Sequence, residues 1–149
     1  MEKWLAPYLE GISSLKECKR LNLYTILLGY LSYEENQKLE KLAPKKLKVA
    51  SGSNIAIDYS NPAQPILAVR LQEIFGTKTT PTLLNGKIKL LIHLLSPARR
   101  AVQVTQDLES FWENSYTDVR KELRGKYKKH YFPENPLEAV ATSKTKRFM

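Results

Sequence analysis

The stretch Asn85-Gly86-Lys87-Ile88-Lys89-Leu90-Leu91-Ile92-His93-Leu94 decides the fold class. Asparagine and glycine both tolerate positive φ, so Asn85-Gly86 predicts a two-residue hairpin turn. From Ile88 to Leu94 an apolar residue then falls at every second position, which is the period of a β-strand. This part of the chain is therefore predicted to be a sheet.

The residues around this hairpin have the same period of two. Residues 46–49 and 55–59 alternate between polar and apolar, and residues 102–104 form a last short run. Residues 66–75 begin like a strand and end with the spacing of one or two helical turns. About five short strands interrupted by a short helix are the count of a small OB-like β-barrel, which we favour for residues 45–105. An open α+β sheet gives much the same pattern.

Helices are predicted before this sheet region. Asn22 can cap a helix whose apolar residues recur at spacings of three and four. Ser32 and Glu35 form a capping box, in which each side chain accepts a hydrogen bond from the other's backbone N–H. The helix that they open must end before Pro44. Residues 1–44 are therefore predicted to be a helical segment, too short to form a stable bundle alone.

A long amphipathic helix is predicted after the sheet region. Thr105 is a good N-cap, and Gly125 is a good C-terminal stop. The apolar stripe between them consists of Leu108, Phe111, Trp112, Tyr116, Val119 and Leu123. The predicted fold class is α+β, with the helix and a basic extension over residues 106–136 and a polar, disordered tail over residues 137–149.

The charge distribution points to a polyanionic partner. The 149 residues carry a net charge of +9, with 24 Lys and Arg against 15 Asp and Glu. Residues 1–44 are neutral, whereas residues 45–105 hold nine basic and two acidic side chains, a balance of +7. A basic middle of this kind is typical of proteins that meet nucleic acid, although basic proteins without such a partner also exist.

The motifs of an ATPase or GTPase are missing. Such a machine needs a phosphate-binding loop of the form G-x-x-x-x-G-K-[ST]. The Gly-Lys pairs at 86–87 and 125–126 lack both the preceding glycine and the following Ser or Thr. His93 and His130 have no second ligand at metal spacing, and no G-x-S-x-G nucleophile motif occurs. We expect no catalytic residue, no metal and no cofactor in this chain.

Targeting signals are also missing from the sequence. No apolar run reaches the 18 residues of a membrane span, and residues 1–4 do not begin a signal peptide. Cys18 is the only cysteine, which excludes an intramolecular disulfide and suits a reducing compartment. We expect a cytoplasmic protein with no membrane partner.

Two groups of basic residues are candidate nucleic-acid contacts. The first lies around the end of the long helix, where Lys and Arg can neutralise phosphates and aromatic rings can stack on unpaired bases. Its members are Arg120, Arg124, Lys126, Tyr127, Lys128, Lys129 and Tyr131. The second group lies in the sheet region and consists of Lys87, Lys89, Arg99 and Arg100, with Arg70 nearby. The alternatives are a complemented helix dipole for the first group and a solvated strand face for the second.

Many short strings of the chain resemble the carboxy-terminal region of HrpB-type bacterial ATP-dependent helicases of the DEAH/RHA class. The strings are Trp4-Leu5-Ala6-Pro7-Tyr8-Leu9-Glu10-Gly11, Ser51-Gly52-Ser53, Ile57-Asp58-Tyr59-Ser60, Leu67-Ala68-Val69-Arg70-Leu71-Gln72-Glu73-Ile74-Phe75-Gly76, Thr80-Pro81, His93-Leu94-Leu95-Ser96-Pro97-Ala98, Val102-Gln103-Val104-Thr105-Gln106-Asp107-Leu108, Phe111-Trp112, Tyr116, Arg124-Gly125-Lys126-Tyr127 and Lys129-His130-Tyr131. The resemblance covers about residues 4–136, in the family's order. It departs from the family pattern at four positions, Ala101, Lys128, Phe132 and Asn135. The family usually has proline where Lys128 stands, and its loss loosens the basic extension.

The resemblance implies a place in a larger machine. In such helicases this region follows the motor domains, and it would supply the end of ratchet-like helices, an OB-like barrel and a carboxy-terminal extension. ATP and Mg²⁺ would bind upstream, in the parent helicase. The first hypothesis is an accessory domain that binds single-stranded RNA or DNA. The alternative is an interaction module that docks on the upstream motor domains without binding nucleic acid itself.

Overall fold

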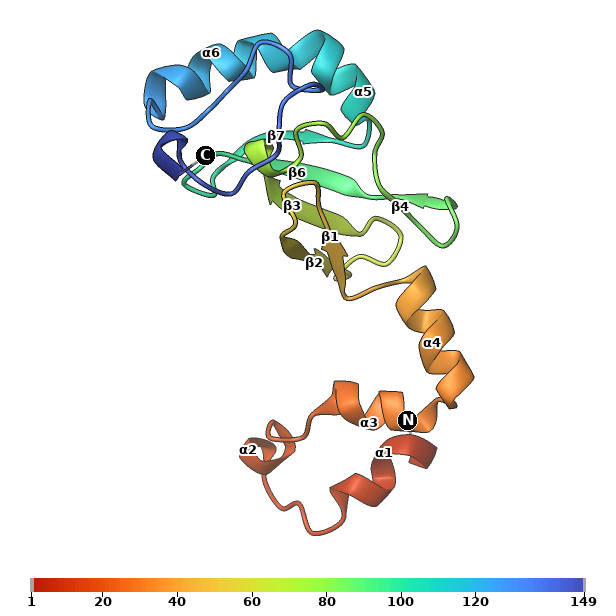
Figure 1. Ribbon diagram of the computed structural model, residues 1–149. Coiled ribbons are helices and arrows are strands. Elements are labelled where there is room, and N and C mark those ends of the chain that lie inside the picture. Colours follow the sequence, from red (N-terminus) through yellow and green to blue (C-terminus); the bar gives the residue numbers. More distant parts are fainter. Residues whose placement is uncertain (1, 149) are drawn as a thin grey trace. The chain divides into compact units, whose positions relative to one another are not determined.

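The computed structural model describes residues 2–148 (Figure 1). The chain divides between Leu42 and Ala43 into two compact units. Among the described residues, no helix has both the length and the apolar character needed to cross a membrane. In the same range, no three His, Cys, Asp or Glu side chains gather where they could hold a metal ion.

The first unit consists of short helices. They are α1 (Glu2–Leu9), α2 (Leu15–Cys18), α3 (Leu23–Tyr30) and α4 (Tyr33–Leu42). The predicted caps are confirmed: Asn22 Oδ1 accepts a hydrogen bond from Thr25 N at 3.1 Å. Ser32 N donates to Glu35 Oε2 at 2.8 Å, and Glu35 N donates to Ser32 Oγ at 3.2 Å. No residue from 5 to 42 is buried, so local capping rather than a core defines these helices.

The second unit contains a five-stranded sheet. Its strands are β1 (Lys46–Lys48), β2 (Asn54–Asp58), β3 (Ile66–Arg70), β6 (Leu91–Leu95) and β7 (Ala101–Thr105). They lie in the order β1-β2-β3-β6-β7, with β3 and β6 parallel and the other neighbours antiparallel. The α+β class is therefore confirmed.

The predicted OB-like barrel is not confirmed, because the sheet is open. Among the described strands, β1 pairs with β2 alone and β7 pairs with β6 alone, so the two edges do not join. The edge strand β1 has three residues, which leaves little backbone for a closing pair. The core is covered instead by the helical segment after β7 (Figure 1). Its buried side chains belong to the same hydrophobic cluster as those of the sheet.

The Asn85-Gly86 turn is longer than predicted. Strands β4 (Thr82–Leu83) and β5 (Ile88–Lys89) pair with each other, and residues 84–87 connect them. Leu84, Asn85 and Gly86 all have positive φ. The alternating run from Ile88 to Leu94 is interrupted at Leu90, a fully buried residue whose N–H donates to Pro81 O at 3.1 Å. The predicted period of two was therefore correct, but the run from Ile88 to Leu94 forms two strands, β5 and β6, instead of one.

A pair of glycine substitutions is expected to change stability in opposite directions. Gly86 has φ +87°, a backbone conformation in which an L side chain is strained even where there is room for it. Gly86→Ala should therefore lower the free energy of unfolding by about 1 kcal/mol. Gly125, which was predicted to end the long helix, lies inside it with open space around it, so Gly125→Ala should raise stability by roughly 0.5–1 kcal/mol. Urea denaturation of both variants measures this, and equal shifts would contradict the assigned conformations.

The long helical segment starts later than predicted. Asp107, not Thr105, is its N-cap, and Asp107 Oδ1 accepts from Ser110 N at 3.0 Å. The segment comprises α5 (Leu108–Ser110), a π-helical turn η2 (Phe111–Ser115) and α6 (Tyr116–Lys126). A π turn advances five residues, so Phe111 and Tyr116 fall on one buried face. With Trp112 they form an aromatic cluster whose neighbouring rings lie 5.0–6.2 Å apart.

The segment after Pro136 is hydrogen-bonded to the rest of the second unit. Thr142 N donates to Gln72 O at 2.9 Å, and Gln72 Nε2 donates to Lys144 O at 3.0 Å. Lys146 N donates to Lys129 O at 2.9 Å. Gln72 lies in the 3₁₀ turn η1 (Leu71–Glu73) after β3 and is buried. The polar composition of residues 137–149 predicted disorder, whereas the described residues of this segment make these bonds to the buried Gln72 and to Lys129.

Candidate nucleic-acid interface

The basic extension after α6 is partly tied to the domain. Arg120 Nε donates to Phe132 O at 3.1 Å, and Arg120 Nη2 lies 3.3 Å from Glu134 Oε1. The side chain of Arg120 is 15% exposed. Its guanidinium therefore fastens the extension back onto α6, which is a structural arrangement rather than that of a free phosphate contact.

The aromatic residues of the extension differ in how far they are free to stack. Tyr127 is half-buried against the core, and its hydroxyl donates to Ser96 Oγ at 3.3 Å. Tyr131 is 36% exposed. A stacking platform needs an accessible ring face. Tyr131 keeps part of this property, whereas Tyr127 anchors the extension to the loop after β6.

The cations of the first group remain on the surface. Arg124, Lys126, Lys128 and Lys129 are all exposed. Lys126 Nζ lies 2.6 Å from Glu122 Oε1, one turn earlier on α6. This hydrogen bond is the main cause that raises the pKa of Lys126, with Arg100 acting weakly in the opposite direction. The ion pair is exposed and can open at little cost.

The second predicted group is split between two ends of the sheet. Lys87 and Lys89 belong to the β4–β5 hairpin that leads into β6, whereas Arg99 and Arg100 follow its far end. Five strand residues at about 3.3 Å each separate the two pairs. The structure therefore does not bring Lys87 and Lys89 together with Arg99 and Arg100.

The loop after β6 instead joins the first group. Arg99 has φ +60°, and the turn is closed by hydrogen bonds from Arg99 N to Ser96 O at 2.8 Å and from Arg100 N to Ser96 Oγ at 3.2 Å. Ser96 also accepts from Tyr127, so this loop and the end of α6 are in contact. We call Arg70, Arg99, Arg100 and Lys126 the basic rim.

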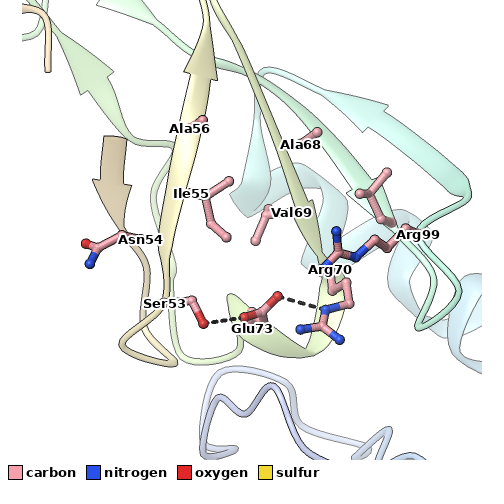
Figure 2. Close-up of a pocket in the computed structure, with 10 residues that line it drawn as sticks. Ser53, Asn54, Ile55, Ala56, Ala68, Val69, Arg70, Glu73 and Arg99 are labelled. Atoms are coloured by element: carbon pink, nitrogen blue, oxygen red, sulfur yellow. Dashed lines mark hydrogen bonds and ion pairs between the residues drawn. The ribbon is translucent and has the colours of Figure 1, made fainter. Parts of the chain in front are cut away.

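A groove lies at the end of the sheet where the parallel strands β3 and β6 finish. Figure 2 shows Arg70 and Arg99 at this groove, with Ala56 and Ala68 on the neighbouring strands. The groove is open to solvent and has a volume of about 370 Å³. Its small alanine side chains leave the sheet surface accessible. Its charged lining residues are Arg70, Arg99 and Glu73, so its net charge is positive.

His130 lies in the turn after α6, close enough to Arg70 of the basic rim to be affected by its charge. His130 Nδ1 lies 3.0 Å from Gln72 Oε1. Burial, and then the charge of Arg70, hold the pKa of His130 below its ordinary value. His130 is therefore neutral near pH 7, so the positive charge of this edge comes from the arginines and lysines.

Sequence reasoning missed Glu73 and its serine partners. Glu73 is buried, and its carboxylate accepts hydrogen bonds from Ser53 Oγ at 2.6 Å, Ser51 Oγ at 3.2 Å and Arg70 Nε at 2.9 Å. These bonds outweigh the burial that opposes them, so the pKa of Glu73 lies below its ordinary value. Twenty residues separate Ser53 from Glu73, and no local pattern in the sequence connects them.

The comparison with known families identifies this region. The model described as "ATP-dependent helicase C-terminal" matches residues 4–136. The chain belongs to this HrpB C-terminal family. The predicted resemblance is thereby confirmed, over the range in which the strings of the sequence suggested it.

Relatives of the HrpB C-terminal family support the same assignment. The chain is 42% identical over 148 residues to "ATP-dependent RNA helicase HrpB" of Escherichia coli (strain K12). The match covers 99% of this chain and spans 18% of that relative's length. A crystal structure of the E. coli DExH-box NTPase HrpB superposes with a TM-score of 0.84 at 42% identity, covering 97% of this chain and 18% of that one. A second, of the E. coli DEAH/RHA helicase HrpB, gives a TM-score of 0.66 at 41% identity, covering 88% and 16%.

Proposed function

We propose that this chain is a nucleic-acid-binding accessory domain of an HrpB-like ATP-dependent RNA helicase. The basic rim carries the proposal, because it gathers cations from three separate places in the sequence at one end of the sheet. Cations that neutralise phosphates bind nucleic acid without demanding a base sequence. The relative's name, an ATP-dependent RNA helicase, favours RNA as the partner.

The catalytic work belongs to other parts of such a helicase. The relative extends far beyond the matched region, since the chain spans 18% of its length. ATP and Mg²⁺ are therefore proposed to act in the parent protein, in the cytoplasm, while this domain holds a single strand. Within the chain, Arg124, Lys126, Lys128 and Lys129 contact phosphates beside Arg99 and Arg100, and Tyr131 stacks on a base.

A second candidate function rests on the first unit. Its described side chains include exposed apolar residues with no core to cover them, of which Leu15 is 81%, Tyr33 79% and Tyr30 60% exposed. Large exposed apolar side chains are typical of surfaces that meet another protein where they form a continuous patch. Docking on the motor domains of the helicase would cover them. The two functions are compatible, because they use different units of the chain.

Fluorescence anisotropy with labelled single-stranded RNA and DNA tests the proposed function. The chain should bind both, with an affinity that falls steeply as salt rises. A variant with Arg124, Lys126, Lys128 and Lys129 all changed to alanine should bind roughly tenfold or more weakly and show a smaller salt slope. Lys16→Ala/Lys19→Ala, which removes two exposed charges from the first unit, should bind like the wild type. A folded chain that binds neither strand would contradict the proposal and favour a docking module.

A further inference from the structure

The buried carboxylate of Glu73 is held by hydrogen bonds from side chains, which the packing of an apolar core does not require. It is 2% exposed and accepts hydrogen bonds from the hydroxyls of Ser51 and Ser53 and from the guanidinium of Arg70. Figure 2 shows Ser53 and Arg70 on either side of it. A charged group is buried at a cost unless hydrogen bonds replace its water. Here three donors do so, Ser51 and Ser53 from the turn between β1 and β2 and Arg70 from the end of β3, which fixes the carboxylate in place.

Glu73 restrains Arg70 in a particular way. The ion pair joins Arg70 Nε to Glu73 Oε2 at 2.9 Å. The bond to Glu73 engages Nε of Arg70. Within residues 2–148, no other hydrogen bond engages its two terminal nitrogens, so both can donate to another acceptor. A guanidinium held by its inner nitrogen is pre-organised, because fewer rotamers remain to be lost when the terminal nitrogens bind an anion.

Arg99 reaches the same groove from the loop after β6. Figure 2 shows its side chain extending from the loop after β6 toward Arg70. None of the ion pairs within residues 2–148 includes Arg99. Its loop is closed by Ser96, so the backbone that carries it is fixed. Arg70 and Arg99 bring two positive charges to this opening against the one carboxylate of Glu73, so its net charge is positive and favours an anion.

We propose that Arg70 and Arg99 bind one phosphodiester of a single strand in this groove, and that Glu73 is the positioning residue for Arg70. This inference rests on the proposed function. A phosphate offers several acceptor oxygens to the forked N–H groups of arginine. Ala56 and Ala68 have small side chains, so the sugar-phosphate backbone of a single nucleic-acid strand can approach the sheet in this groove.

A double-mutant cycle on the full chain tests this assignment. Binding of a labelled oligouridylate is measured by anisotropy for the wild type, Arg70→Gln, Glu73→Gln and the double variant. Arg70→Gln should weaken binding by roughly tenfold, which is the loss expected for a charge-assisted contact. Glu73→Gln alone should weaken binding severalfold relative to the wild type. When it is added to Arg70→Gln, it should not weaken binding further. Independent, multiplying effects in the double variant would overturn the positioning role.

Further variants separate folding, charge and the identity of the anion. Arg70→Lys keeps the charge but lacks the forked geometry, so it should bind as weakly as Arg70→Gln. Lys78→Gln removes an exposed charge of an ion pair with Glu109 and should bind like the wild type. Circular dichroism melts identify any variant that does not fold. Inorganic phosphate is added at the same concentration as the oligonucleotide. If it displaced the oligonucleotide from the wild type, the site would be one for free phosphate and the inference would fail.

The two proposals fail in different ways. If the folded wild type does not bind the oligonucleotide, the proposed function is wrong and the groove assignment falls with it. If the wild type binds the oligonucleotide and both Arg70→Gln and Arg99→Gln bind it with the affinity of the wild type, the proposed function stands and the groove assignment is wrong.

Discussion

Replacing Tyr116 by alanine is expected to lower the free energy of unfolding of the second unit by about 3–5 kcal/mol. Tyr116 is 2% exposed and lies at the centre of the aromatic cluster. Its ring meets those of Phe75, Phe111 and Trp112 at centroid distances of 5.4–6.3 Å. Its removal leaves a cavity between the helical segment and the sheet, which the fixed backbone cannot fill.

The hydroxyl of Tyr116 accounts for a smaller part of this effect. It donates to Pro133 O at 2.7 Å, and burial raises the pKa of this hydroxyl. Tyr116→Phe keeps the ring and leaves the carbonyl of Pro133 without its partner, at a cost of about 1–3 kcal/mol. Urea denaturation in a Trp4→Phe background, followed by the fluorescence of Trp112, measures both variants. A loss below about 1 kcal/mol for Tyr116→Ala would contradict the packing of this cluster.

Removal of residues 137–149 is expected to lower the free energy of unfolding by about 2–4 kcal/mol. The segment supplies the partners of two buried polar groups of Gln72, its backbone carbonyl and its side-chain amide. Ala139 and Ala141 also pack against the core. A disordered tail could be removed without effect, so this truncation separates the two descriptions.

Gln72→Ala provides a matched variant that keeps the full length of the chain. It removes the bonds to Lys144 O and to His130 and should reproduce part of the loss. Ser143→Ala, on an exposed residue of the same segment, should change little. Thermal melts followed by circular dichroism compare the three proteins. Unchanged melting of both the truncated chain and Gln72→Ala would show that the segment does not stabilise the domain.

Local signals in the sequence predicted local structure well. The capping box at Ser32 and Glu35 and the cap at Asn22 depend on residues three apart, and both are confirmed. The period of two located the strands, because alternation reflects one buried face. Closure of the sheet depends on how its edges meet, and alternation within a strand carries no information on that.

The candidate interface depended on contacts that are distant in sequence. The two predicted groups were each local, but the structure divides one of them and joins its Arg99 and Arg100 to the end of α6. Arg120 and Tyr127 looked like binding residues by type, yet both are engaged within the domain. Glu73 and Ser53 belong to strings that resemble the family, but no spacing in the sequence connects them, since a buried carboxylate network is defined by tertiary contacts.

The most direct test of the proposed interface is a nuclear magnetic resonance titration of the ¹⁵N-labelled chain with a short single-stranded RNA. We expect shifts of the amides of residues 96–100 and 124–131 and of the Nε–H signal of Arg70, all of which disappear as salt rises. A folded chain in which no signal moved, or in which the shifts were confined to residues 5–42, would contradict nucleic-acid binding at the basic rim.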